Sequence, residues 1–130
     1  MDTSVWSLAL RRDSPAGIAE VRCLRDALLG GEAVYATGLI LQELLQGVSG
    51  PRDPKRIVDH FAAVSLVMPT LEDHINAAGI RNHCRRRGIQ VGTVDALLAQ
   101  VCIRHGFVML TCDQDFRHIA RHTSLTTWST

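Results

Sequence analysis

Four short motifs place carboxylates where a run of apolar residues gives way to a run with helical spacing. In one-letter code they are DTSVW from position 2, QELLQG from position 42, TVDALLA from position 93 and TCDQDF from position 111. In open α/β sheets such junctions lie at the carboxyl ends of strands, where these folds build their sites. Because carboxylates repel one another, a cluster of four or five requires a divalent cation or protons to neutralise it. The motifs therefore indicate a metal-dependent phosphodiesterase.

The rest of the chain has the alternating pattern that could position these acids. Short apolar runs predict strands near 34–36, 65–68, 107–110 and 125–127. Helical spacing predicts a short helix after Asp2 and further helices near 15–29, 38–46, 54–64, 71–87, 93–105 and 113–121. Strands that alternate with helices predict an α/β sandwich, with a central parallel sheet of four to five short strands and helices on both faces.

Two of the predicted helices matter most for the site. The helix over 93–105 is the most apolar, so we expect it to be central. The helix over 71–87 is expected to bury one face that includes Ile75, Ala78 and Gly79.

Length and composition indicate a single globular domain over 1–130. The hydrophobic share of 46% and the charged share of 21% exclude a disordered or collagen-like chain. The apolar runs are too short to span a bilayer, and the N-terminus lacks the basic start and apolar stretch of a signal peptide. We therefore expect a cytoplasmic protein without membrane contact. The four cysteines form no C-x-x-C pair, so we expect buried thiols rather than zinc ligands or disulfides.

The charge of the chain suits RNA through its distribution. The formal net charge is only +1, but 13 of the 14 basic residues are arginines, and arginine can bind a phosphate through two parallel hydrogen bonds. If several of the acids share one cleft, the remaining surface is relatively basic. The densest basic segment includes Arg81, Arg85 and Arg86, which a helix would direct toward water. These arginines are candidates for contact with RNA phosphates, and a solvated surface is the alternative.

The four motifs, in this order and near these spacings, resemble those of the PIN-domain ribonucleases, and most closely the VapC-type toxins of bacterial toxin–antitoxin pairs. The resemblance extends from Asp2 to about Trp128 and is strongest between Gly88 and Phe116. It implies the PIN-domain sandwich and an endoribonuclease toxin that hydrolyses RNA phosphodiester bonds with metal-activated water. The start of the chain departs from the family pattern, because Met1 alone precedes the first aspartate where an apolar strand is usual.

The resemblance also implies the site residues and the partners. The catalytic acids of the family correspond to Asp2, Glu43, Asp95 and Asp113, and the expected metal ligands are Asp2, Asp95, Asp113 and the additional Asp115. Carboxylate oxygens favour Mg²⁺ or Mn²⁺ over zinc. The implied partners are an RNA substrate such as a tRNA or rRNA loop, a cognate VapB-type antitoxin and a second copy of the chain in a homodimer.

Three other interpretations stay open at this point. The acids could serve only as helix caps, a common role in a first turn. The chain could be a PIN-like domain that has lost catalysis and acts as a binding module. It could also be a phosphoacceptor receiver domain, but that fold needs paired acids after its first strand and a lysine after its last core strand. Here Asp2 stands alone and Lys55 is far from any predicted strand end.

Overall fold

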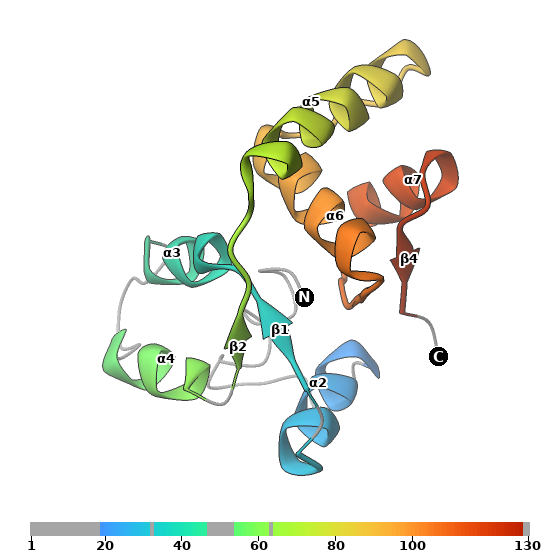
Figure 1. Cartoon of the computed structure of the whole chain (residues 1–130). Helices are drawn as coiled ribbons and strands as arrows, with labels where there is room; N and C mark the ends of the chain where they lie inside the picture. The colour runs from blue at the N-terminus through green and yellow to red at the C-terminus, as the bar shows by residue number, and fades with distance from the viewer. Residues whose placement is uncertain (1–18, 32, 47–53, 63, 129–130) are drawn as a thin grey trace. The chain divides into compact units, whose positions relative to one another are not determined.

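A computed structural model describes residues 19–31, 33–46, 54–62 and 64–128. The chain divides into two compact units, the first ending at Val67 and the second beginning at Met68. Figure 1 shows the helices and strands of both units. Each unit combines helices with one parallel pair of strands, so the described chain is mixed α/β as the sequence predicts.

The first unit contains three helices and two short strands among its described residues. Their bounds are α2 (Ala19–Leu29), β1 (Tyr35–Ala36), α3 (Gly38–Gln46), α4 (Pro54–Phe61) and β2 (Ser65–Leu66). The two strands pair in parallel, with Tyr35 opposite Ser65 and Ala36 opposite Leu66. The buried apolar side chains include Val21, Leu24, Val34, Ile40, Leu44, Ile57 and Phe61. The bounds of α3 are those that the sequence predicts.

The second unit is built around one buried helix. Its elements are α5 (Leu71–Arg86), α6 (Thr93–His105), β3 (Val108–Met109), α7 (Gln114–His122) and β4 (Thr126–Thr127). Every residue of α6 from 96 to 102 is buried, which confirms that this helix is central. It ends at Gly106, whose φ of 68° lies in the left-handed region where glycine avoids the steric cost of a Cβ atom. The strands β3 and β4 pair in parallel.

The predicted buried face of α5 is wrong. Ile75 is 61% exposed, and Ala78 and Gly79 are exposed as well. The buried residues of this helix are Asp73, Ala77 and Cys84. The helix is therefore turned so that a charged residue, rather than the isoleucine, lies inside.

Asp73 can be buried because its carboxylate accepts several hydrogen bonds. Its Oδ2 accepts a hydrogen bond from the backbone N–H of Thr70 at 2.9 Å, and the Thr70 hydroxyl accepts one from the Asp73 N–H at 3.2 Å, which completes a capping box. The Arg104 Nε donates to both carboxylate oxygens at 2.8 and 2.9 Å. Burial alone raises the pKa of Asp73, but the hydrogen bonds from Arg104, Thr70 and Gln100 offset it and lower the pKa to about 2. This network fixes the start of α5 to the last turn of α6.

The cysteines are free thiols, and two of them are buried. Cys84 and Cys102 lie inside, whereas Cys23 and Cys112 are partly exposed, so the prediction of burial holds for the first pair only. Burial raises the pKa of both the Cys84 and the Cys102 thiol, which disfavours the thiolate that metal binding requires. None of the helices in the described ranges is long and apolar enough to cross a membrane.

Candidate metal centre

The first turn of α6 carries Asp95. The N-cap of this helix is Gly92, whose backbone is extended with φ −67° and ψ 156°, and the Ala96 N–H donates to the Gly92 carbonyl at 3.0 Å. As a glycine, Gly92 has no side chain of its own to cap α6. A carboxylate at the third helical position is favoured there by the positive end of the helix dipole. The Oδ2 atom of Asp95 is directed toward the cap, since it would lie 3.8 Å from a Cβ atom added to Gly92.

The start of α7 carries Asp113 just before the helix and Asp115 in its first turn. The hydroxyl of Thr111, a residue only 1% exposed, accepts a hydrogen bond from the Asp113 N–H at 2.9 Å. Asp113 is the N-cap of α7, and its Oδ1 accepts a hydrogen bond from the Asp115 N–H at 2.9 Å. Asp113 therefore does cap a helix, as the alternative interpretation expects. The two hydrogen bonds also fix the direction in which its carboxylate lies.

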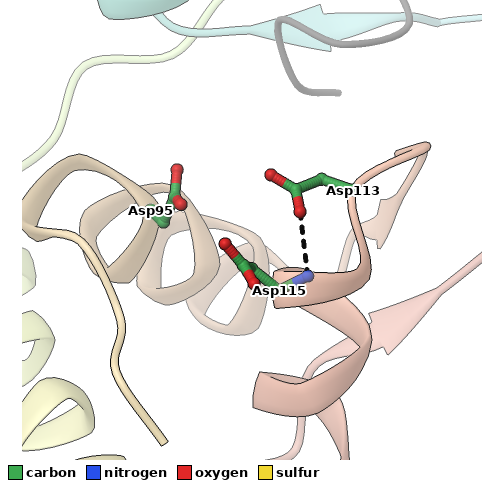
Figure 2. Close-up of side chains that lie close together, drawn as sticks. All are labelled: Asp95, Asp113 and Asp115. Atoms are coloured by element: carbon green, nitrogen blue, oxygen red, sulfur yellow. Dashed lines mark hydrogen bonds between the residues drawn. The ribbon is translucent and has the colours of Figure 1, made fainter.

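These two helix starts bring three carboxylates together. Asp95, Asp113 and Asp115 each offer one oxygen such that the three atoms lie within 4.8 Å of one another. Figure 2 shows the Asp95 side chain from α6 facing those of Asp113 and Asp115 at the start of α7. Asp95 and Asp113 are half-buried and Asp115 is exposed, so the cluster is accessible from solvent.

The donor set fits a hard divalent cation. All three donors are carboxylate oxygens, the ligand type that Mg²⁺ and Mn²⁺ prefer. Two like charges about 5 Å apart repel by roughly 1 kcal/mol in water and by about 3 kcal/mol near a protein surface. A cation between them would replace this repulsion with attraction. Because Mg²⁺ holds its oxygen ligands at about 2.1 Å, small side-chain rotations would be enough to bring the three oxygens to one ion.

Of the acids expected in the site, one belongs to the first unit and one lies outside the described residues. Glu43 is exposed on α3, in the first unit, and its place beside the cluster stays a prediction. Asp2 lies outside the described residues, so its role also stays a prediction. The cluster in the second unit thus contains Asp95, Asp113 and Asp115 of the acids expected from the sequence.

The three candidate arginines for RNA contact are all exposed on α5, but their hydrogen bonds differ. Arg85 donates to the Asn82 side chain at 2.8 Å and Arg86 to the Asn82 carbonyl at 3.3 Å, both within α5. The Arg81 Nε instead donates to the carbonyl of Val91 at 2.9 Å, outside the helix. The sequence analysis missed this contact, because no motif marks a hydrogen bond between a side chain and a backbone ten residues away. Contact of the arginines with RNA stays a prediction.

Comparison with known proteins identifies the family of the chain. A model of the PIN domain family matches residues 1–122. The chain is 34% identical to VapC ribonuclease Mb1587 of Mycobacterium bovis over 131 residues, which cover 96% of this chain and 93% of that protein. Ribonuclease VapC11 of Mycobacterium tuberculosis matches to the same extent. Ribonuclease VapC1 of Rickettsia felis is 31% identical over 93 residues, 65% of this chain and 69% of that protein.

These matches decide between the fold families considered above. They cover both units, and they leave no support for the receiver-domain interpretation. The chain belongs to the PIN-domain family, on its VapC branch.

Proposed function

We propose that the chain is the endoribonuclease toxin of a type II toxin–antitoxin system, acting on RNA in the cytoplasm. The observation that carries the proposal is the convergence of Asp95, Asp113 and Asp115 within 4.8 Å. Its support from comparison is the similarity to VapC ribonucleases over nearly the whole chain. The three carboxylates repel one another, and a metal-dependent reaction would account for their convergence.

The acids have distinct roles in this proposal. Asp95, Asp113 and Asp115 would hold Mg²⁺ or Mn²⁺, together with Asp2. The ion, when bound, would orient the scissile phosphate, acidify the attacking water and offset charge on the leaving oxygen. Glu43, which we assign to catalysis but not to the metal, would accept the proton of that water at a carboxylate oxygen. Hydrolysis in this way leaves a 3′ hydroxyl and a 5′ phosphate.

The proposal also names the partners of the chain. Arg81, Arg85 and Arg86 would bind RNA phosphates, because each is a positively charged residue exposed on α5. Single-stranded loops, such as those of tRNA or rRNA, are the expected substrates, since a loop can present its backbone to such a site. A VapB-type antitoxin would block the reaction by placing a basic or aromatic side chain among the acids, and the chain is expected to form a homodimer.

The test is cleavage of an end-labelled RNA that contains a single-stranded loop. Purified protein should cleave it with Mg²⁺ or Mn²⁺, stop in excess EDTA and resume when either ion is restored, without any requirement for Zn²⁺. An Asp113→Asn preparation purified in the same way is the control for contaminating nuclease. Undiminished cleavage in excess EDTA would contradict the proposal. RNA binding without cleavage in both ions would support the binding-module interpretation instead.

A further inference from the structure

The segment between α5 and α6 is held to α5 at both of its ends. At its start, the N–H groups of Arg87 and Ile89 donate to the Cys84 carbonyl at 2.9 and 3.0 Å, around Gly88 with a φ of 77°. At its end, the Arg81 Nε donates to the Val91 carbonyl at 2.9 Å. The partners on the helix move from Cys84 to Arg81, about one turn closer to the start of α5. The segment therefore turns back along α5 before α6 begins.

The end of this segment determines where α6 starts. Val91 is only 5% exposed and directly precedes the N-cap Gly92. Since Gly92 has no side chain of its own to cap α6, the backbone before it helps to define the first turn. The hydrogen bond to Val91 is strong for its type, because the guanidinium that donates it is charged.

The position of the first turn sets the direction of Asp95. Successive residues of an α-helix are rotated by about 100°, so a start displaced by one residue would turn the Asp95 carboxylate away from Asp113. Asp95 is the third residue after the N-cap, so fraying of the helix end would also displace it. Fixing Val91 is therefore a way of fixing Asp95.

We propose that Arg81 is a positioning residue, which holds the start of α6 through the Val91 carbonyl and so keeps Asp95 beside Asp113 for a divalent cation. The inference rests on the proposed function in that the cation is the reason for this placement. It separates Arg81 from Arg85 and Arg86, whose hydrogen bonds stay within α5.

Two substitutions separate the hydrogen bond from the charge. In Arg81→Gln, the amide nitrogen lies as many bonds from Cα as the arginine Nε, so a donor is kept while the charge is lost. In Arg81→Met, the side chain is as long as that of glutamine but has neither a hydrogen-bond donor nor a charge. Any effect of lost charge on cation affinity is therefore shared by both variants, and their difference reports the hydrogen bond.

The first measurement is Mn²⁺ affinity by titration. Arg81→Met should bind Mn²⁺ about 10- to 100-fold more weakly than the parent, the usual effect of removing a group that orients a metal ligand. Arg81→Gln should stay within about threefold of the parent on the same grounds. Arg121→Gln, which removes an exposed arginine on α7, is the control for lost charge and should leave the affinity within that range.

The second measurement is amide hydrogen exchange in metal-free protein. The amides of the first turn of α6 should exchange faster in Arg81→Met than in the parent, and at the parental rate in Arg81→Gln. RNA affinity measured without metal tests the phosphate contact of Arg81 separately. Loss of that contact should weaken RNA binding equally in Arg81→Met and Arg81→Gln.

The outcomes distinguish the inference from the proposed function. Equal Mn²⁺ affinity and equal exchange in Arg81→Met and Arg81→Gln would overturn the role of Arg81. A parent protein that binds no Mn²⁺ would overturn the proposed metal site, while exchange in the metal-free variants would still decide whether Arg81 holds α6. If Arg81→Met does not fold, Arg81→Lys replaces it, since a methylene then occupies the Nε position; it should exchange faster than Arg81→Gln.

Discussion

In the second unit, one buried aspartate and one cluster of three aspartates differ in their partners and in their exposure. Asp73 is 0% exposed, accepts two hydrogen bonds from the Arg104 Nε and one from the Thr70 N–H, and has a pKa of about 2. The cluster joins Asp95, Asp113 and Asp115, which are half-buried or exposed and lie within 4.8 Å of one another.

The difference separates an acid that stabilises the fold from a cluster to which we assign a function. The charge of Asp73 is balanced inside the protein, so the folded state gains from its ionisation. The charges of the cluster repel one another, and a cation bound between them would replace this repulsion with attraction. A site of this kind costs stability in the absence of its ligand, as functional sites commonly do.

The largest expected effect is on cleavage by Asp113→Asn. The variant loses a proposed metal ligand but keeps the cap of α7, because asparagine caps about as well as aspartate. RNA cleavage should fall by at least about a hundredfold, more than for a residue that only supports a ligand. The metal-free unfolding free energy should stay the same or rise, because one source of repulsion is gone.

Single-turnover cleavage and thermal denaturation measure these two effects. Asp59→Asn, at an exposed position on α4, is the matched control and should change neither. A folded Asp113→Asn protein that cleaves at nearly the parental rate would show that Asp113 is only a cap.

Asp73→Asn should have the opposite profile. Removing one partner of a buried ion pair costs about 3 to 5 kcal/mol. Because the Arg104 side chain is 35% exposed and can be solvated, we expect a smaller loss, about 2 to 3 kcal/mol of unfolding free energy. Cleavage per folded molecule should stay within about threefold of the parent, since Asp73 is outside the cluster.

Urea unfolding and the cleavage assay provide this comparison, with Glu72→Gln at the exposed neighbouring position as control. If Asp73→Asn kept its stability but lost cleavage, Asp73 would serve the reaction and not the stability of the fold.

A smaller effect is expected in the pH dependence of stability. The pKa of Asp73 falls from 3.8 to about 2 on folding, so its ionisation stabilises the protein fully above pH 3.8. This contribution, about 2 kcal/mol, is lost as the pH falls toward 2. Urea unfolding between pH 5 and pH 2 should therefore show a steeper loss in the parent than in Asp73→Asn. If the unfolding free energies of the two proteins fell in parallel with pH, the lowered pKa of Asp73 would be contradicted.

Local signals in the sequence were enough to predict the helices that carry the acids. The bounds of α3 and α6 agree with the structure, because apolar spacing and a terminal glycine mark these helices. The placement of Asp95 and Asp113 at helix starts follows from the same signals. Their meeting depends on the packing of α6 against α7. We expected it from the position of the acids after predicted strands and from the resemblance to PIN-domain ribonucleases, because helical periodicity does not report it.

Contacts between distant residues account for what the sequence did not predict. The buried face of α5 was wrong because apolar spacing favoured Ile75, whereas the ion pair of Asp73 with Arg104 spans 31 residues and turns the helix the other way. The hydrogen bond from Arg81 to Val91 has no pattern of its own, since its acceptor is a backbone carbonyl. Contacts of this kind form only when the chain folds, so helix propensity and apolar periodicity do not predict them.

The most direct test of the metal site is the effect of Mn²⁺ on thermal stability. At a concentration 100 times the dissociation constant, a ligand that binds only the folded state adds about 2.7 kcal/mol, which should raise the Tm of the parent by several degrees. Asp73→Asn should show the same rise from a lower starting Tm, and Asp113→Asn should show almost none at the same Mn²⁺ concentration. An equal rise in the parent and in Asp113→Asn would contradict the assignment of the cluster as the metal centre.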